Sequence, residues 1–339
     1  RLFWVEWGVL RLSWVKLKGG HVPSSRQVEL DKSLVTLLSG YRAVAGANIY
    51  VGDGTRTNVK GSAILNATIG VVVEKGHAYS GGGIAAYGSK SMIILGKQSQ
   101  LISNHADVDG GGVFLSHGST LSALSSLFDD NYGQNGGAIY VTEGSNIKVA
   151  NLTISNNRAS YGGGGIMVRS SSSCNLKLSK VASNTGVYGA GVHVSSNSTF
   201  SATDSRIEFN IASQLGGGVC AVSPLHIDFK RIIFYSNTVS IGNGGGALIT
   251  NPASVHIDSS TFRANIATGT ETSRGGGLFV SDIGYTDNSA GSFILTDTIF
   301  ESNTADAGTS VTQHSDAFRT AGGGLYLNLV KASLWNASL

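Results

Sequence analysis

A repeat of about 27 residues is the feature that most constrains this chain of 339 residues. Between Gly81 and Asn303 the chain repeats an asparagine, a loop, two or three glycines and an aliphatic residue. Successive asparagines up to Asn265 are 26 to 28 residues apart. A fixed period is typical of architectures in which each unit stacks on its neighbours. The repeated asparagines are Asn104, Asn131, Asn157, Asn184, Asn210, Asn237, Asn265 and Asn303.

Each repeat has a constant arm and a variable arm. The constant arm runs from a glycine to the next asparagine and spans 19 residues, as from Gly112 to Asn131. The return arm spans 7 to 9 residues in the middle repeats, 12 after Asn265 and 21 after Asn303. Insertions that share one corner of a solenoid often form its recognition surface. We therefore expect this variable corner to be one of two places where specific recognition could occur.

The constant arm predicts three short strands. The first follows the glycines, as in Val113-Phe114-Leu115, with aliphatic flanks and a variable middle residue. A second apolar pair, such as Leu121 and Ala123, and a single apolar residue, such as Phe128, precede each asparagine. Alternation with period two places these residues on one face of each strand. β-Branched residues, glycines and short strands favour an all-β parallel β-helix over a helical solenoid. We predict about 8–10 rungs.

Two domains are predicted. Residues 46–339 form the β-helix, which we expect to be truncated at its C-terminal end, in an excerpt of a longer protein. Residues 1–45 contain Trp4, Trp7 and Trp14 with partial alternation, and they form either degenerate rungs or a cap over the open end.

The asparagines are expected to form a structural ladder. In a parallel β-helix each strand pairs with its equivalent one rung away, at about 4.8 Å. Each amide side chain would then bond its copies in the rungs above and below. Asparagine suits this corner because it tolerates left-handed backbone angles and satisfies turn amides.

The middle column of the first strand is predicted to face outward. It is more apolar than a solvent-facing column needs to be, which makes it a candidate surface for partner binding or self-association. A covering loop, a neighbouring domain or stacking of the column on itself would also explain it. The column contains Phe114, Tyr140, Met167, His193, Cys220, Leu248, Phe279 and Tyr326.

Two half-motifs carry a resemblance to a known family. Gly136-Gly137-Ala138-Ile139, together with Phe128-Asp-Asp-Asn131 and Phe234-Tyr-Ser-Asn237, resembles the repeat of the chlamydial polymorphic outer membrane proteins, and related variants cover residues 80–330. The resemblance implies a right-handed, single-stranded parallel β-helix of the pectin-lyase-like superfamily. It also implies display on a cell surface as an exported passenger domain that acts in adhesion.

The superfamily also includes polysaccharide lyases and glycoside hydrolases, whose chemistry needs clustered acids. Asp129 and Asp130 form the only adjacent acid pair, and we interpret them as a solvated turn. His226-x-Asp228 and His256-x-Asp258 recur one rung apart and could stack into a small polar patch. We predict no catalytic, cofactor-binding or metal-binding residues and no cofactor.

The charge, apolar content and cysteines of the sequence limit the classes of partner that we expect. A net charge of +3, without a basic run, does not indicate nucleic-acid binding. The sequence contains no stretch of about 18 apolar residues, so it predicts no membrane-spanning helix. Cys174 and Cys220 form neither a metal motif nor a disulfide framework. We expect two free thiols, with Cys174 buried in the core and Cys220 facing outward.

Four glycosylation sequons are present, at Asn66, Asn151, Asn197 and Asn336, and none coincides with the ladder. They fit a secreted protein, although a chain rich in Asn, Ser and Thr contains some by chance. We predict a non-catalytic extracellular or cell-surface protein that binds a protein or glycan ligand, in adhesion or as a structural stalk. The alternative is a carbohydrate-active enzyme or a glycan-binding module on the same fold.

Overall fold

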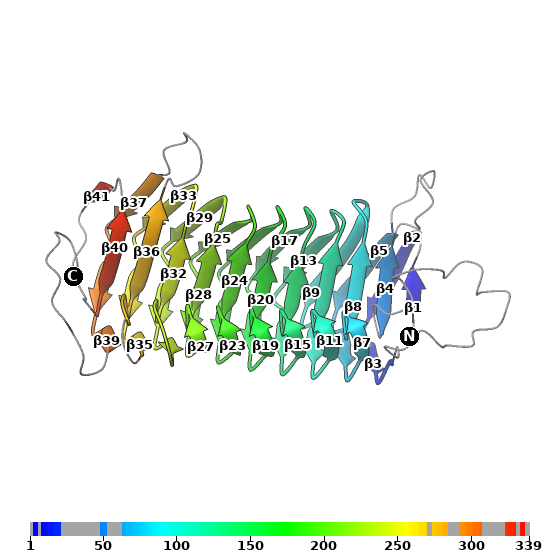
Figure 1. The fold of residues 1–339 in the computed structure, drawn as a ribbon. Helices are drawn as coiled ribbons and strands as arrows, with labels where there is room; N and C mark the ends of the chain where they lie inside the picture. Colours follow the sequence, from blue (N-terminus) through cyan, green and yellow to red (C-terminus); the bar gives the residue numbers. More distant parts are fainter. Residues whose placement is uncertain are drawn as a thin grey trace, which may run out of the picture.

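The protein is a parallel β-helix. The structure, a computed structural model, describes residues 3–5, 8–21, 48–52, 63–269, 273–283, 292–306, 323–329 and 333–335. Helices are absent from these ranges, and their strands, labelled β1 to β41, stack into four parallel sheets. Figure 1 shows the rungs as one long row, with the first strands at one end and the last at the other. The all-β parallel β-helix predicted from the sequence is confirmed.

The first sheet contains the strands that follow the glycines, and its 11 strands lie in the order β1 (Phe3–Val5), β4 (Ile49–Gly52), β8 (Ile84–Tyr87), β12 (Val113–Ser116), β16 (Ile139–Val141), β20 (Ile166–Val168), β24 (Val192–Ser195), β28 (Val219–Val222), β32 (Ala247–Thr250), β36 (Leu278–Ile283) and β40 (Leu325–Leu329). The second sheet also has 11 strands, β2 (Gly8–Ser13), β5 (Ala63–Ile69), β9 (Ser91–Lys97), β13 (Thr120–Leu124), β17 (Asn146–Ala150), β21 (Ser173–Lys177), β25 (Thr199–Thr203), β29 (His226–Lys230), β33 (Ser254–Asp258), β37 (Ser292–Thr296) and β41 (Ser333–Trp335).

The third sheet has 10 strands, β3 (Lys16–Lys18), β6 (Val72–Glu74), β10 (Gln100–Ile102), β14 (Leu127–Asp129), β18 (Thr153–Ser155), β22 (Lys180–Ala182), β26 (Arg206–Glu208), β30 (Ile233–Tyr235), β34 (Thr261–Arg263) and β38 (Ile299–Glu301). The fourth sheet has nine strands, β7 (His77–Ser80), β11 (His105–Asp109), β15 (Tyr132–Asn135), β19 (Arg158–Gly162), β23 (Thr185–Tyr188), β27 (Ile211–Leu215), β31 (Thr238–Val239), β35 (Ile266–Thr268) and β39 (Thr304–Asp306).

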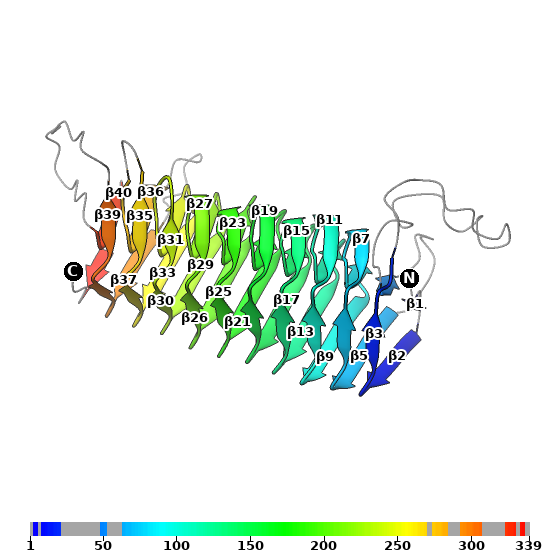
Figure 2. The same ribbon diagram turned by 90° about the horizontal axis from the view of Figure 1, so that it is seen from below.

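The fourth sheet corrects the expectation of three strands per rung. It lies in the variable arm, between the ladder asparagine and the glycines, and Figure 2 shows it along one side of the molecule. Its inward residues are small, such as Ala106, Ala159 and Ala212, so the arm has no apolar strand pattern. The constant spacing of the rungs still pairs these strands, because the backbone hydrogen bonds of a β-sheet need no particular side chain.

The N-terminal residues include a further rung. Strands β1, β2 and β3 pair in parallel with β4, β5 and β6, as in Leu10 with Leu65 and Leu17 with Val73. The described part of residues 1–45 therefore extends the first three sheets as a rung. The domain boundary predicted between residues 45 and 46 lies outside the described residues.

The core lies inside the first three sheets. Val113, Leu115, Leu121, Phe128 and their equivalents in other rungs are buried, as the alternation predicts. Near the C-terminal end, the rings of Phe234 and Phe262 stack with centroids 4.4 Å apart, and Phe300 continues the stack at 4.9 Å. Aromatic stacking between rungs adds to the hydrophobic burial that holds the solenoid together.

The asparagine ladder is confirmed from Asn104 to Asn303. Each Nδ2 donates to the Oδ1 of the next asparagine at 2.9–3.0 Å. The same Oδ1 accepts the backbone N–H of the preceding asparagine, as in Asn131 N to Asn157 Oδ1 at 2.9 Å. Most of these side chains are fully buried. The ladder therefore satisfies the polar atoms of the corner, which would otherwise be buried without partners.

One reason given for the asparagines is wrong. The residue in the left-handed region is the one before each ladder asparagine, such as Asp130 (φ 54°), Ser183 (φ 56°) and Phe209 (φ 55°). The asparagines therefore occupy the corner for their amide bonds and not for backbone freedom.

Asn48 extends the ladder, although it lies just before β4 of the first sheet and not after a strand of the third sheet. In that rung Gly76 occupies the ladder position, and a Cβ on it would lie 2.6 Å from Asn48 Nδ2. Asn48 Oδ1 accepts the Gly20 N–H at 3.0 Å, and its Nδ2 donates to the Glu74 carbonyl at 3.4 Å. The side chain of Asn48 thus takes the place of the missing amide.

Candidate functional site

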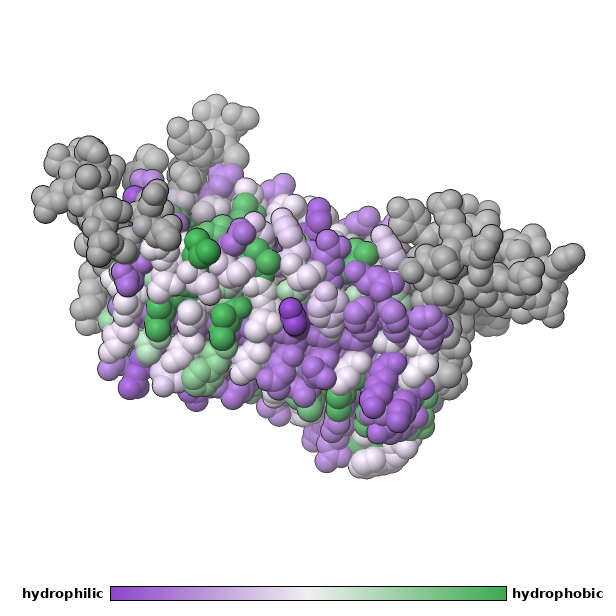
Figure 3. Space-filling view, turned by 60° about the horizontal axis from the view of Figure 1, so that its bottom comes forward, coloured by the Kyte–Doolittle hydropathy of each residue, from purple (hydrophilic) through white to green (hydrophobic). Residues whose placement is uncertain are grey.

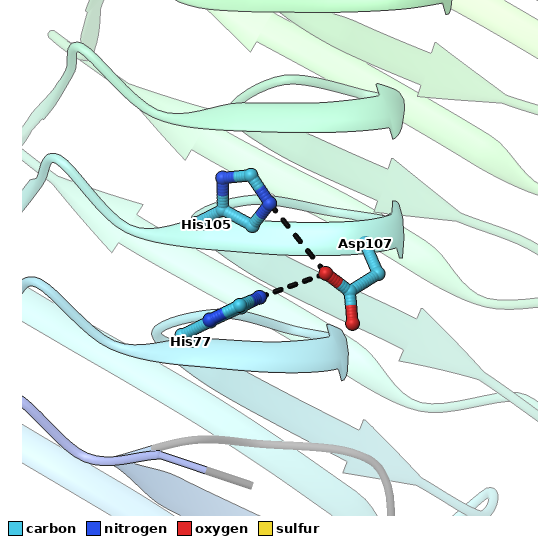
Figure 4. Close-up of side chains that lie close together, drawn as sticks. All are labelled: His77, His105 and Asp107. Atoms are coloured by element: carbon cyan, nitrogen blue, oxygen red, sulfur yellow. Dashed lines mark hydrogen bonds and ion pairs between the residues drawn. The ribbon is translucent and has the colours of Figure 1, made fainter. Parts of the chain in front are cut away.

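A group of histidines lies at the N-terminal end of the fourth sheet. His77 opens β7, His105 opens β11, and the two are register partners in adjacent rungs. Asp107 lies two residues after His105, with the buried Ala106 between them. Residues two apart on a strand share a face, so His105 and Asp107 point to the same side. Figure 4 shows both imidazoles directed at the Asp107 carboxylate.

The three side chains meet at one carboxylate oxygen. His77 Nε2 lies 2.7 Å from Asp107 Oδ1, and His105 Nε2 lies 3.6 Å from the same atom. The His77 and His105 rings are 4.5 Å apart in an edge-to-face arrangement. The His105 ring also stacks on Tyr132 at 4.7 Å. The side chains are 31–43% exposed, so solvent reaches the group.

The electrostatics favour neutral imidazole at His105. Partial burial lowers its pKa, and the neighbouring His77 lowers it further. The Asp107 carboxylate opposes both effects but does not reverse them. A neutral imidazole leaves one ring nitrogen with a lone pair for a metal ion or a proton.

No metal-binding residue was predicted from the sequence, whereas the structure brings three possible ligands together. One ligand atom from each of His77, His105 and Asp107 lies within 4.8 Å of the others, and the described residues contain no second such group. Two histidines one repeat apart, with an acid two residues after the second, were a usable signal. The fourth sheet was not predicted, so nothing indicated that the three side chains share a face.

The other histidine–aspartate pattern pairs across rungs without a third ligand. His256 Nδ1 lies 3.1 Å from Asp228 Oδ1, and His226 Nδ1 lies 3.1 Å from Ser254 Oγ. Asp258 instead accepts a hydrogen bond from Thr296 at 2.9 Å. These side chains are half-buried on the second sheet. The structure therefore brings one histidine and one aspartate together, as a small polar patch.

The adjacent acids do not act as a pair. Asp129 Oδ1 accepts hydrogen bonds from Ser155 and Asn156 in the following rung, at 2.7 and 2.8 Å. Asp130 accepts one from Ser103 in the preceding rung, at 2.7 Å. Because the carboxylates bond in opposite directions along the solenoid, they serve the packing of turns.

The apolar middle column of the first sheet does not face solvent. Its side chains point away from the core, as predicted, but they are only 0–8% exposed, so the column is a covered strip and not a surface strip. These side chains stack on one another along the column. The ring centroids of Phe114 and Tyr140 are 5.6 Å apart, and those of Phe279 and Tyr326 are 4.9 Å apart. The buried members are Phe114, Tyr140, Met167, His193, Cys220, Leu248, Phe279 and Tyr326.

The ends of the fourth-sheet strands cover this column. A Cβ on Gly162, the last residue of β19, would lie 3.2 Å from His193 and 3.7 Å from Met167. Tyr188 and Leu215, the last residues of β23 and β27, pack on the part of the column that contains Cys220. The fourth sheet has register shifts before these ends, consistent with a bulge that redirects the chain. A partner-binding role for the column stays a prediction, and its burial does not favour it.

His193 is an unusual member of the buried column. Its Nδ1 has no hydrogen-bond partner among the described residues. Its pKa is lowered to about 4, mainly by burial and in smaller part by the charge of Arg169, while a hydrogen bond to the Tyr188 backbone opposes the shift. The imidazole is therefore neutral in the folded chain over the physiological range.

We expect His193 to make the fold sensitive to acid. Because the folded pKa lies below the ordinary value of 6.5, the unfolded chain binds the proton first, and stability falls as the pH drops from about 6.5 towards 4. The loss amounts to about 2 kcal/mol between about pH 7.5 and pH 5. His193→Met, which copies Met167 in the same column, should remove this part of the loss in urea unfolding at both pH values. An equal pH dependence in both proteins would contradict the assignment.

Both cysteines are free and buried. Cys174 lies in the core, as predicted. Cys220 points away from the core, as predicted, but it is fully buried because Tyr188 and Leu215 pack on its part of the column. Burial raises the pKa of both thiols, that of Cys220 to about 12. Neither thiol therefore ionises readily.

The sequons differ in accessibility. Asn151 and Asn197 are exposed and lie at turns with positive φ. Asn66 is half-buried inside β5, and Asn336 lies outside the described residues. The turn positions offer the clearer access for a glycan, and all four asparagines stay possible glycosylation sites.

The variable corner corresponds to the fourth sheet and the turns around it. Figure 3 shows hydrophilic side chains gathered over its N-terminal half and hydrophobic ones interspersed towards its C-terminal half. Ile211 and Ile266 occupy the solvent-facing column there and are 50% and 37% exposed. Residues 270–272 and 307–322, which belong to the two longest return arms, lie outside the described residues.

Comparison with known proteins identifies one repeat. Residues 151–169, from the turn before β18 to the residue after β20, match the family model described as the Chlamydia polymorphic membrane protein repeat. No curated protein and no solved structure matches the chain. Within the described ranges, no helix is long and apolar enough to cross a membrane. The chain thus carries a polymorphic membrane protein repeat on a parallel β-helix, and this repeat points to the outer membrane or the cell surface.

Proposed function

We propose that this chain is a non-catalytic, surface-displayed β-helix that acts in adhesion or as a structural stalk. The proposal rests on one observation: equivalent residues stack from rung to rung along the described chain. The polymorphic membrane protein repeat lies in the middle of this stack. A rigid row of rungs holds its surface residues at fixed spacing, and repeat proteins use such extended surfaces for binding. Several exposed contacts can then act together.

The fourth-sheet face is the part of the surface that supports adhesion best. It belongs to the arm whose length varies between repeats, and Ile211 and Ile266 are exposed on it. Scattered exposed apolar residues on a polar sheet can anchor a protein or glycan ligand. Self-association of two chains through this face would use the same residues.

The rival proposal, a carbohydrate-active enzyme on this fold, has less support. Lyases and glycosidases need several carboxylates at one site. Over the described residues, the one cluster of possible metal ligands contains a single carboxylate. The adjacent acids Asp129 and Asp130 bond to opposite rungs.

Binding to cell or glycan surfaces tests the proposal. Beads coated with the 339-residue chain should bind cultured epithelial cells or spots on a glycan array. The double variant Ile211→Thr/Ile266→Thr, which copies Thr185, Thr238 and Thr304 of the same column, should lose most of this binding. Ile294→Thr is the matched control, because Ile294 is 40% exposed on the second sheet.

The outcomes separate the alternatives. Loss of binding in the double variant alone would support adhesion through the fourth sheet. Equal binding by all three proteins would place the contact elsewhere. Absence of binding by the unchanged chain would leave the stalk as its function. Turnover of a polyuronide by the purified chain would overturn the non-catalytic proposal.

A further inference from the structure

We infer that His77, His105 and Asp107 form a binding site for one divalent transition-metal ion of the Zn²⁺ class. The inference concerns a different property from adhesion and does not depend on it. It rests on the convergence of two imidazoles on one carboxylate oxygen in adjacent rungs.

The distances suit a metal ion after small side-chain rotations. The three ligand atoms lie within 4.8 Å of one another. Ligands at about 2.0–2.1 Å from a tetrahedral ion are separated by roughly 3.3 Å. The separation of 3.6 Å from His105 Nε2 to Asp107 Oδ1 is close to this, and that of 2.7 Å for His77 is somewhat shorter. Entry of an ion would replace the His77–Asp107 hydrogen bond with two bonds to the metal.

A hydrogen-bonded pair alone does not account for the third side chain. The His77–Asp107 contact is complete at 2.7 Å. The 3.6 Å separation from His105 Nε2 to the same oxygen exceeds an ordinary hydrogen bond. His105 nevertheless directs its ring at the same point (Figure 4). A shared ion explains why both rings face one oxygen.

The backbone and the neighbouring rings preorganise the site. His77 N–H donates to the Gly20 carbonyl and His105 N–H to the Gly76 carbonyl, each at 2.8 Å. Stacking of His105 on Tyr132 at 4.7 Å limits rotation of the imidazole. His21 lies in the rung before His77, on the N-terminal side of the group, and its ring centroid is 5.0 Å from that of His77. Ligands held on rigid strands lose little entropy when an ion binds.

The ligand types decide the class of ion. Two imidazoles and one carboxylate suit Zn²⁺, Ni²⁺, Co²⁺ or Cu²⁺, whereas Ca²⁺ and Mg²⁺ prefer sets of oxygen ligands. Three protein ligands leave at least one position for water or a ligand group. Because the side chains are 31–43% exposed, an ion can enter directly from solvent. The bound ion would tie β7 to β11 near the N-terminal end of the solenoid.

Titration calorimetry with ZnCl₂ tests the site on the whole chain, free of any histidine tag. We expect one Zn²⁺ per chain and at least a tenfold loss of affinity in Asp107→Asn and in His105→Gln. His256→Asn is the matched control, because it removes the other cross-rung histidine–aspartate contact, which has no third ligand. This control should bind Zn²⁺ as the unchanged chain does. Failure of the unchanged chain to bind Zn²⁺, or equal affinity in Asp107→Asn, would overturn the inference.

Two further measurements need no variant. Zn²⁺ should raise the melting temperature with increasing concentration, whereas the same concentrations of Mg²⁺ should not. In crystals soaked with Zn²⁺, an anomalous peak should lie about 2.0–2.2 Å from His77, His105 and Asp107. Equal shifts with both ions, or an anomalous peak only at other residues, would contradict the assignment.

Discussion

Asn184→Ala is expected to destabilise the solenoid by about 3 to 5 kcal/mol. Asn184 Oδ1 accepts hydrogen bonds from Asn157 N and Nδ2, at 2.9 and 3.0 Å. Its Nδ2 donates to the Ile154 carbonyl at 3.1 Å and to Asn210 Oδ1 at 3.0 Å. Removal of the amide takes away the partner of the buried Asn157 N–H and the side-chain donor to the Ile154 carbonyl, and each buried group left unpaired costs about 1–3 kcal/mol. The vacated volume adds a cavity.

Two companion variants separate the ladder from asparagine content. Asn175 is exposed on β21 of the same rung, so Asn175→Ala should change stability by no more than about 0.5 kcal/mol. Asn184→Asp keeps the size of the side chain but replaces the amide donor with an acceptor. It should therefore be at least as damaging as alanine, since it faces Asn210 Oδ1 and the Ile154 carbonyl.

Urea unfolding followed by circular dichroism measures the loss, and hydrogen exchange shows whether the rungs around Asn184 open locally. Local opening is relevant because long repeat arrays need not unfold in one step. Equal effects of Asn184→Ala and Asn175→Ala would mean that the ladder contributes little to stability.

Gly163→Ala is expected to cost at least about 3 kcal/mol, or to prevent folding. Gly163 has a φ of +64°, and a Cβ there would lie 2.3 Å from the Ile166 carbonyl oxygen. The substitution therefore combines an unfavourable left-handed backbone with a clash against backbone that cannot move without disturbing β20. Thermal and urea unfolding of the purified variant measure the effect.

Gly144→Ala is the matched control for the clash. Gly144 has nearly the same φ, +70°, but no atom lies within 4 Å of a Cβ placed there. Its substitution should cost only the left-handed backbone energy, about 1–2 kcal/mol. The difference between the two variants measures the close packing between the end of the fourth sheet and the first sheet. Equal losses would show that backbone angle alone explains the first glycine of each run.

The sequence predicted the core well because the core residues alternate. Val113, Leu121 and Phe128 mark inward positions that recur in every repeat, and the structure buries them. The ladder was also predictable, because identical residues at one period must stack in a parallel solenoid. Asn48 was not, because its side chain reaches the ladder from a different strand position.

The candidate metal site was missed for a physical reason. His77, His105 and Asp107 belong to the variable arm, where small residues such as Ala106 point inward and leave no apolar pattern. Pairing there depends on backbone groups that the rest of the rung brings into register. Without that register, the sequence does not show which polar side chains share a face.

The apolar column of the first sheet separates what the sequence determines from what the tertiary structure determines. Its period and composition are visible in the sequence, from Phe114 to Tyr326, and alternation correctly places it on the side of the strand away from the core. Its exposure depends on whether another segment lies over it, which is a property of the whole rung. The ends of the fourth-sheet strands cover it, as Gly162 does for His193. The sequence by itself therefore determined the repeat, the core and the ladder, because these follow from local alternation and stacking. Only the tertiary structure decided which surfaces remain open, because long-range packing determines them.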